Sequence, residues 1–490
     1  MIKTNKVLSI FSSIITVAAS VFFIYELVTL HLIPTKLLIP IVIIFILINA
    51  IILVLLNFYG KNIVTKLFMI MIVLVIACLS SFGGLYLMKT SNMFNQITKY
   101  NETVKQTVSV VVKENSAYED LKDIKNQELA VLENSGSQGI SKCIKDLDDK
   151  HIKVNVKKYE GISAMVDALE AESVAALIIT ESSRGNILDI EEYKNFNKVT
   201  RTIYQAEYLV KDTNKSKAVK NITTEPFNIL VTGSDSRVSL YENSRSDVNM
   251  LITVNPKTST ILLTSIPRDY YVETVCDIDD ACLIGQLDKL THTGVHGVNT
   301  TKKTVENLLG IEINYTLKVG FESVTGIVDA LGGINVNVAP GYAVSSFHTA
   351  PQYGVVEGVN HLNGEQALAY ARERYAYQEG DRQRVKNQQE VLMAVIDKVT
   401  SPSVISGYSN LMDALGNTFI TNMKTKEIQE LIQYQLKVMP SWKFEQNSLD
   451  GTGSTEYCAE LGQAAYVMIP DRNTIESAKI QINEVVNKKQ

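Results

Sequence analysis

Three long apolar runs, at residues 7–33, 37–56 and 67–88, occupy the start of the chain. Each is long enough, at roughly 20 residues, to cross the hydrocarbon core of a bilayer as a helix. A buried helix of a soluble protein rarely continues so far without charge, and the first run exceeds the apolar region of a cleaved signal peptide. We therefore expect residues 1–88 to form a membrane anchor of three transmembrane helices.

The lysines that flank these runs indicate an orientation. Two lysines precede the first run and two flank the connection between the second and third, whereas the connection between the first and second holds one. Cytoplasmic flanks of membrane helices carry the excess of positive charge. We therefore expect a cytoplasmic N-terminus in a multi-pass protein of the cell membrane. With three crossings, everything after residue 88 is then extracellular.

Residues 99–210 show a different pattern, in which short β-branched runs alternate with amphipathic stretches. Such segments lie at 107–112, 140–147, 152–156, 162–169 and 174–180. The alternation predicts a small α/β accessory domain built of strand–helix units. It contains no glycine-rich phosphate loop, metal-ligand spacing or nucleophile motif, and Cys143 is typical of a core residue. The accessory domain is therefore interpreted as a spacer or docking module.

A polar, lysine-rich segment at 211–226 ends in proline and predicts a linker. Apolar positions then become denser, and a closing helix is expected from about Asn473. Residues 227–490 are therefore assigned to a second, larger domain. Within it, Cys276 and Cys282 would close a small ring if they pair in an oxidising exterior, but two unpaired thiols fit the sequence equally well.

The first predicted strands of the larger domain lead into charged residues. Apolar runs at 227–231, 250–254 and 260–265 predict three strands, and turn residues between the last two make them a hairpin. A hairpin returns the chain to the edge it left, so Arg268 is expected beside Asp247. If the first strand also pairs antiparallel, one sheet edge gathers Asp235, Arg245, Asp247 and Arg268.

A second charged cluster follows farther along the chain. Asn363 and Gln366 have capping-box spacing, which predicts a helix that ends near Arg372. Asp381 is placed to cap a second helix, whose N-terminal backbone N–H groups favour an anion. Arg384 and Gln388 lie four residues apart on one face of that helix. Residues 372–386 hold five cations against three acids; the cations are Arg372, Arg374, Arg382, Arg384 and Lys386.

These residue types suit a divalent metal ion and phosphate. Two carboxylates with open oxygen positions suit a hard cation such as Mg²⁺, and guanidinium groups bind phosphate oxygens in pairs. For the first cluster alone, Asp–Arg ion pairs that close the sheet edge fit equally well.

Other kinds of site fit the sequence less well. The chain carries a net charge of −5, and no aromatic residues interleave the arginines, which disfavours nucleic acid. Walker, zinc-hydrolase, nucleophile-elbow and dinucleotide motifs are absent. Glycines break the helical spacing of His292 and His296, which indicates a structural or loop role rather than metal ligation.

Several separated motifs, in their order and spacing, resemble the LytR-CpsA-Psr family of cell-envelope phosphotransferases. They are GSDSR, RSDVNMLITVNP, IPRD, DKLTHTG, NTTKKTVENLLGIEINY, ALGGINVNV, LNGEQALAYARERY and GDRQRVKNQQ. The three-span anchor and the additional α/β domain are similar to the capsule-associated CpsA branch. The resemblance implies that the larger domain is an α/β/α sandwich around a mixed central sheet.

The resemblance also implies an activity. Such a phosphotransferase moves a glycopolymer, capsular polysaccharide or a teichoic-acid-like polymer, from a polyprenyl-pyrophosphate carrier to peptidoglycan. Its expected partners are the membrane, this lipid-linked polymer, the peptidoglycan acceptor and capsule-synthesis proteins, but not nucleic acid.

Residue roles follow from the motif positions. Asp235 and Asp247 are expected to hold Mg²⁺ or Mn²⁺. Arg245, Arg268, Arg372, Arg374, Arg384 and Gln388 are expected to bind the pyrophosphate, and Arg268, Asp235, Asp247 and Arg374 to carry catalysis. Arg237 also falls at a motif position, but that position varies among members of the branch. Asp269 and Asp381 are candidates for the group that deprotonates the acceptor hydroxyl.

Two other functions stay open. One is a hydrolase that cleaves the polyprenyl pyrophosphate without an acceptor. The other is a non-enzymatic sensor of lipid phosphate that regulates capsule synthesis.

Overall fold

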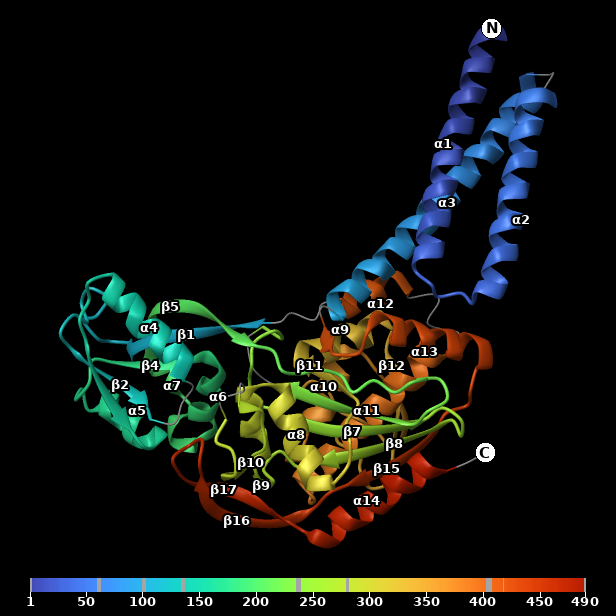
Figure 1. Cartoon of the computed structure of the whole chain (residues 1–490). Helices are drawn as coiled ribbons and strands as arrows, with labels where there is room; N and C mark the ends of the chain where they lie inside the picture. Colours follow the sequence, from blue (N-terminus) through green and yellow to red (C-terminus); the bar gives the residue numbers. More distant parts are fainter. Residues whose placement is uncertain are drawn as a thin grey trace. The chain divides into compact units, whose positions relative to one another are not determined.

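The computed structural model of the chain describes residues 2–59, 63–98, 103–133, 137–234, 239–278, 282–401, 408–416 and 418–488 (Figure 1). The chain forms two compact units. The first comprises Met1–Thr98, Ile405–Asn417 and Lys424–Pro440, and the second comprises Lys99–Val404, Thr418–Met423 and Ser441–Gln490. Two short segments of the region 227–490 thus group with the N-terminal helices rather than with the rest of that region.

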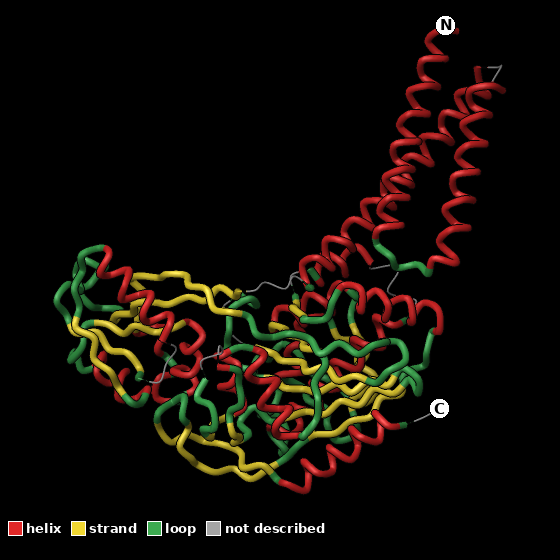
Figure 2. Tube along the Cα trace, viewed as in Figure 1, coloured by secondary structure: helices red, strands yellow, loops and turns green. Residues whose placement is uncertain are grey.

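Three long apolar helices form most of the first unit (Figure 2). They are α1 (Ile2–Thr29), α2 (Thr35–Val54) and α3 (Ile63–Ile97). Each is long and apolar enough to cross a membrane. Apolar side chains such as Phe11 and Phe82 are exposed on them, as expected for helices that lipid solvates. The expectation of three apolar helices is confirmed, while the direction in which they cross stays a prediction.

Two shorter helices from late in the sequence complete the first unit. They are α12 (Tyr408–Leu415) and α13 (Thr425–Val438). Lys89 of α3 forms an ion pair with Asp413 of α12 at 2.6 Å. The hydroxyl groups of Thr98 and Thr425 lie 2.7 Å apart, within hydrogen-bond distance.

The second unit begins with the α/β domain expected at 99–210. Its five strands pair in the order β3-β2-β4-β1-β5. They are β1 (Thr103–Lys113), β2 (Glu128–Leu132), β3 (Asn155–Tyr159), β4 (Ala176–Thr180) and β5 (Thr200–Lys211). The helices are α4 (Ser137–Asp149), α5 (Ile162–Glu170), α6 (Glu181–Asp189) and α7 (Phe196–Val199). Strands β2 and β5 were not among the segments that the sequence pattern picked out.

Two hydrophobic cores hold this accessory domain together. One packs α4 against the sheet through residues such as Val110, Cys143 and Leu147. Burial raises the pKa of the Cys143 thiol to about 12, so Cys143 is a core residue as expected. The other core lies against α5 and α7, and it also takes in Cys458, Leu461 and Val467 from the C-terminal part of the chain. The accessory domain therefore shares a hydrophobic core with a distant segment of the same unit.

A six-stranded mixed sheet forms the centre of the larger domain. Its strand order is β14-β11-β6-β7-β8-β15, with β6–β11 and β8–β15 parallel and the other pairs antiparallel. The strands are β6 (Phe227–Ser234), β7 (Val248–Asn255), β8 (Thr260–Ile266), β11 (Tyr315–Gly320), β14 (Phe419–Thr421) and β15 (Lys443–Ser448). The central strands are nearly continuous apolar runs because both faces of the sheet are covered.

Helices cover the two faces of this sheet. On one face, Leu230, Leu251 and Leu262 pack against α8 (Val298–Leu309) and α14 (Arg472–Asn487). The apolar stripe of α14, which includes Ile475 and Ile482, faces the sheet. The opposite layer consists of α9 (Phe321–Ala330), α10 (Gly364–Arg372) and α11 (Asp381–Thr400). The expected α/β/α layers around a mixed sheet are confirmed.

Three two-stranded pairs flank these layers. They are β9 (Tyr271–Glu273) with β10 (Leu287–Lys289), β12 (Ile334–Val338) with β13 (Gly358–Leu362), and β16 (Gly451–Cys458) with β17 (Gln463–Pro470). The β16–β17 hairpin supplies the three residues that enter the core of the accessory domain.

Cys276 and Cys282 form a disulfide bond, which resolves the alternative left open by the sequence. Closing so short a loop restricts the unfolded chain only modestly. We expect the double substitution Cys276→Ser and Cys282→Ser to lower the free energy of unfolding by about 2 kcal/mol. Thermal unfolding of the full-length chain in detergent micelles, compared with wild type, measures this. A variant as stable as wild type would contradict it.

Candidate functional site

The sheet edge predicted from the hairpin carries a cluster of charged side chains. Strand β7 pairs antiparallel with both β6 and β8, as expected. Asp247 directly precedes β7 and Arg268 follows β8 by two residues, so the pairing brings them together. Arg268 Nη1 donates to Asp247 Oδ1 at 3.0 Å, and the Thr291 hydroxyl donates to the same oxygen at 3.1 Å. Arg268 Nε also lies 3.6 Å from Asp269.

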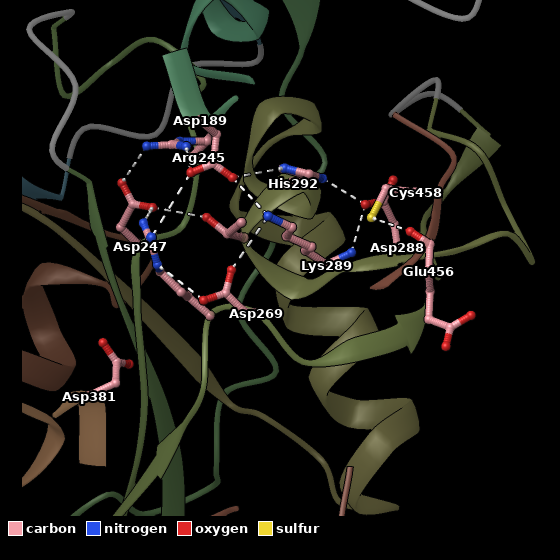
Figure 3. A network of polar contacts seen from close by, with 12 residues as sticks. Asp189, Arg245, Asp247, Asp269, Asp288, Lys289, His292, Asp381, Glu456 and Cys458 are labelled. Carbon is pink, nitrogen blue, oxygen red and sulfur yellow. Dashed lines mark hydrogen bonds and ion pairs between the residues drawn. The ribbon is translucent and has the colours of Figure 1, made fainter. Parts of the chain in front are cut away.

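A residue of the accessory domain takes part in this cluster. Asp189, the last residue of α6, places Oδ1 2.7 Å from Arg245 Nη1 and Oδ2 2.9 Å from Lys289 Nζ. The Nη2 atom of Arg268 lies 4.0 Å from Asp189. Figure 3 shows Asp189 between Arg245 and Lys289, with Asp247 and Asp269 close by. Three cations and three carboxylates thus meet at a site that both domains build.

Burial and charge act in opposite directions on these groups. Burial alone would raise the pKa of Asp247, but Arg245, Arg268 and the Thr291 hydroxyl lower that pKa overall. The pKa of Asp189 is likewise lowered against the effect of burial, by Arg245, Lys289 and His292. Burial would lower the pKa of Arg268, yet the neighbouring carboxylates raise it. Each group therefore stays ionised because its neighbours are charged.

The second predicted cluster lies at the junction of α10 and α11. The capping box is present, because Asn363 Oδ1 accepts from the Gln366 backbone and Gln366 Oε1 accepts from the Asn363 backbone. Beyond α10, Arg374 stacks on the Tyr375 ring, with 4.6 Å between guanidinium carbon and ring centroid. Arg372 ends α10, and Gln388 lies one turn after Arg384 in α11; both side chains are half-buried.

Asp381 does not cap α11, which corrects the sequence-based expectation. Gly380 occupies the N-cap position and Asp381 is the first helical residue. The Asp381 carboxylate instead pairs with Arg384 Nη2 at 2.7 Å and approaches Arg374 Nη1 at 3.7 Å. A guanidinium three residues ahead on the helix competes successfully with the backbone N–H groups for this carboxylate.

Electrostatics connect the two clusters. Burial lowers the pKa of Arg384, and the positive charges of Arg268 and Arg374 lower it further, outweighing Asp381. Within the described part of the chain, Arg268 Nε and Arg384 Nε are buried and make no hydrogen bond. Partly buried guanidinium groups that repel one another and have N–H groups left over are suited to an anion with several oxygens.

A buried carboxylate shapes the loop that presents Arg374. Glu373 is 1% exposed. Its Oε1 accepts hydrogen bonds from the backbone N–H groups of Arg374, Tyr375 and Ala376, at 2.9, 2.8 and 3.1 Å. Its Oε2 accepts from the backbone N–H of His348 at 2.5 Å. The sequence pattern alone marks Glu373 merely as one of three acids among the cations.

The metal-binding expectation concerns two carboxylates, of which one is described here. Asp235, and also Arg237, lie outside the described residues. Among described residues, no group of three or more His, Cys, Asp or Glu side chains is arranged to hold a metal ion. Asp247 Oδ2 makes a 3.5 Å contact with Arg245 Nη2, whereas Oδ1 accepts two hydrogen bonds. Asp247 therefore retains a carboxylate oxygen suited to a hard cation.

The two histidines singled out by their spacing are structural. They lie in a 3-10 helix over Leu290–His296. His292 is fully buried and its Nδ1 lies 2.6 Å from Asp288 Oδ1, while His296 Nε2 lies 2.5 Å from Glu460 Oε1. His292 Nε2 points toward Asp189 at 4.0 Å (Figure 3). Both histidines thus connect the 3-10 helix to neighbouring acidic residues.

Asp189 and Lys289 were not predicted as site residues from the sequence. Lys289 lies within the quoted DKLTHTG segment, so the family motif offered a signal for it. Asp189 lies between apolar residues of the accessory domain, where the sequence offered no motif. Its role depends on a contact between domains that pattern alone does not reveal.

Comparison with known proteins gives the family. The LytR_cpsA_psr family model matches residues 193–484. A curated relative, the polyisoprenyl-teichoic acid–peptidoglycan teichoic acid transferase TagU of Bacillus mycoides, is 33% identical over 248 residues, 50% of this chain and 77% of the relative. TagU of Bacillus licheniformis is 30% identical, covering 60% of this chain and 90% of the relative.

A solved structure and a second family model also match. The crystal structure of protein gbs0355 from Streptococcus agalactiae has 28% sequence identity and a TM-score of 0.47, and covers 56% of this chain and 93% of that one. A model of DNA polymerase processivity factors matches residues 65–179. That range begins inside α3, ends inside β4 and crosses from the first compact unit into the second, so it does not coincide with a structural unit of this chain.

The family match and the transferases among its relatives identify the chain as an enzyme, a phosphotransferase. The chain belongs to the LytR-CpsA-Psr family.

Proposed function

We propose that the protein transfers a glycopolymer from a polyprenyl-pyrophosphate carrier to a hydroxyl group of peptidoglycan. The observation that carries the proposal is the proximity of two partly buried arginines, Arg268 and Arg384, whose buried Nε–H groups make no hydrogen bond with the described residues. A pyrophosphate supplies enough oxygens to satisfy these donors and enough charge to relieve the repulsion between them. The relatives' names support the donor and acceptor, because they are polyisoprenyl-teichoic acid–peptidoglycan transferases.

The proposed reaction is a displacement at phosphorus. The acceptor hydroxyl oxygen attacks the phosphorus that carries the polymer and loses its proton, while the bridging bond to the polyprenyl phosphate breaks. The products are a phosphodiester between polymer and peptidoglycan and a free polyprenyl phosphate. Arg268, Arg374 and Arg384 would neutralise the charge that develops on the leaving phosphate. Asp269 and Asp381 are the proposed candidates for the base.

We further propose that the enzyme uses Mg²⁺ or Mn²⁺, held by Asp247 together with Asp235. The Oδ2 atom of Asp247 supports this, because it accepts one long hydrogen bond, from Arg245 at 3.5 Å, and has room for a metal ion. When bound, the ion would help to neutralise phosphate charge. We also propose that the polymer is capsular, that capsule-synthesis proteins are partners, and that the site is extracellular. The Cys276–Cys282 disulfide supports the extracellular location, since disulfides persist in oxidising compartments.

Reconstitution of the full-length chain in lipid vesicles tests the proposal. With a polyprenyl-pyrophosphate-linked glycopolymer and peptidoglycan fragments, we expect polymer to appear covalently on peptidoglycan. EDTA is expected to abolish transfer and Mg²⁺ to restore it. Polyprenyl phosphate released equally fast without acceptor, together with phosphorylated polymer, would favour the hydrolase instead. Binding without turnover of any kind would contradict an enzymatic function.

A further inference from the structure

We propose that Asp189 makes the accessory domain part of the active site, as a positioning residue for Arg245 and Lys289. The inference rests on the proposed transferase function and goes beyond it, since it gives the accessory domain a role in the reaction. The observations that support it are the contacts of Asp189, the way α6 packs, and the interface that fixes this helix in place.

Asp189 makes the shortest ionic contact of both cations. Arg245 lies 2.7 Å from Asp189 but 3.5 Å from Asp247. Lys289 lies 2.9 Å from Asp189 but 3.7 Å from Asp269. Without Asp189, each of these side chains would keep one longer ionic contact. Because long cationic side chains have many rotamers, Arg245 and Lys289 would then lose their fixed orientation toward a phosphate.

Helix α6 also packs directly against the Arg245 side chain. A Cβ atom added at Gly185 would lie 3.2 Å from Arg245 Nε and 3.4 Å from Cδ. Glycine therefore lets the helix approach the arginine stem closely. The same helix supports Arg245 at two points, with its backbone at Gly185 and its carboxylate at Asp189.

The position of Asp189 is set by a packed interface. Its neighbour Ile187 is 1% exposed and belongs to the core that includes Cys458, Leu461 and Val467 of the β16–β17 hairpin. Backbone contacts reinforce this core, because the Ile162 N–H donates to the Leu461 carbonyl at 2.9 Å. An extensive apolar core holds two parts of a protein far more firmly than a single polar contact would.

A second set of contacts joins the domains near strand β1. The Thr107 hydroxyl donates to Glu242 Oε1 at 2.9 Å. The backbone N–H of Asn243 donates to Gln106 Oε1 at 3.1 Å. Both partners in the larger domain lie just before Arg245 in the chain. The accessory domain thus holds the segment that carries Arg245 from two sides.

The charge of Asp189 has two effects with opposite signs, and these allow a sharp test. Removing the charge leaves the site more positive, which strengthens binding of an anion. It also frees Arg245 and Lys289, which weakens stabilisation of the transition state. For Asp189→Asn we expect kcat to fall about tenfold or more while inorganic pyrophosphate binds more tightly than to wild type. Asp189→Glu is expected to recover part of the rate.

Glu181→Gln is the matched control. Glu181 begins the same helix and pairs with Arg184 at 2.7 Å inside the accessory domain. This substitution is expected to leave kcat and pyrophosphate binding close to wild type. Full-length variants in lipid vesicles are compared by steady-state transfer kinetics, by calorimetric titration with inorganic pyrophosphate, and by thermal unfolding.

The possible outcomes distinguish a positioning role of Asp189 from the alternatives. Equal losses of kcat in Asp189→Asn and Glu181→Gln would show that Asp189 acts through domain stability and would overturn the inference. Tighter pyrophosphate binding with unchanged or higher kcat would overturn it in favour of a carboxylate that competes with substrate. If wild type transfers polymer and Asp189→Asn behaves identically, the inference is wrong. If wild type itself transfers nothing, the proposed function fails instead.

Discussion

Replacing Arg268 with alanine is expected to lower the rate of polymer transfer about 100-fold or more, the usual cost of losing one preorganised donor for transition-state charge. Arg268 lies where the carboxylates of Asp247, Asp269 and Asp189 meet, at 3.0, 3.6 and 4.0 Å. Its Nε–H is buried without a hydrogen bond. The substitution removes a proposed phosphate ligand and leaves three neighbouring carboxylates less compensated. The measurement is the initial rate of polymer attachment to peptidoglycan.

Because breaking a buried ion pair costs about 3–5 kcal/mol, the alanine variant risks misfolding. Arg268→Lys keeps the positive charge but lacks the planar fork that binds two oxygens at once. Arg374→Ala is a second variant that is expected to fold, since the Arg374 side chain is more than one-third exposed and its removal disturbs the core less. Both variants are expected to keep the wild-type unfolding temperature within a few degrees and to lose most of the transfer rate.

Arg382→Ala serves as the control. Arg382 lies on α11 close to Arg384, but it is 61% exposed and pairs with Asp450 at 2.9 Å. Its removal changes the net charge by the same amount as Arg268→Ala and Arg374→Ala do. We expect transfer by Arg382→Ala at nearly the wild-type rate. Comparable activity of Arg268→Lys, Arg374→Ala and the control would contradict the proposed site.

The hairpin cluster could be predicted because its geometry is local. Turn residues between two apolar runs determine that the second strand returns beside the first, which places Arg268 next to Asp247 whatever else the chain does. The capping box at Asn363 is equally local, and the structure contains both of its hydrogen bonds. Features that depend only on residues a few positions apart could therefore be predicted correctly from the sequence.

Contacts between distant segments could not be predicted in the same way. Asp189 and Arg245 are 56 positions apart and belong to different domains, and the spacing of apolar residues does not specify how two domains pack. The role of Asp381 was hard to predict for another reason. Its position in the sequence is compatible both with capping the helix and with an ion pair to Arg384. The ion pair prevailed in the structure, and the choice depended on where the helix begins.

Removing the carboxylate of Glu373 is expected to lower both the stability of the chain and its transfer rate. In Glu373→Ala, four backbone N–H groups lose their acceptor at once, those of Arg374, Tyr375, Ala376 and His348. Hydrogen bonds to a charged acceptor contribute about 1.5–3 kcal/mol each, and water can replace those at the exposed end of the loop. We therefore expect the free energy of unfolding to fall by about 3 kcal/mol.

Transfer is expected to fall with it, by about tenfold or more even at temperatures where the variant is folded, because Arg374 loses its fixed direction. Glu373→Gln keeps the shape of the side chain but presents an amide N–H₂ to one set of backbone donors, so its losses should be intermediate. Glu365→Gln is the control and should resemble wild type, because Glu365 lies in the first turn of α10 and makes an exposed hydrogen bond with Tyr353. Circular dichroism melting and transfer rates of the full-length variants measure both effects.

A Glu373→Ala chain that melts like wild type yet transfers poorly would place Glu373 in the chemistry itself. A chain that melts at a lower temperature and transfers normally would mean that the direction of Arg374 is unimportant.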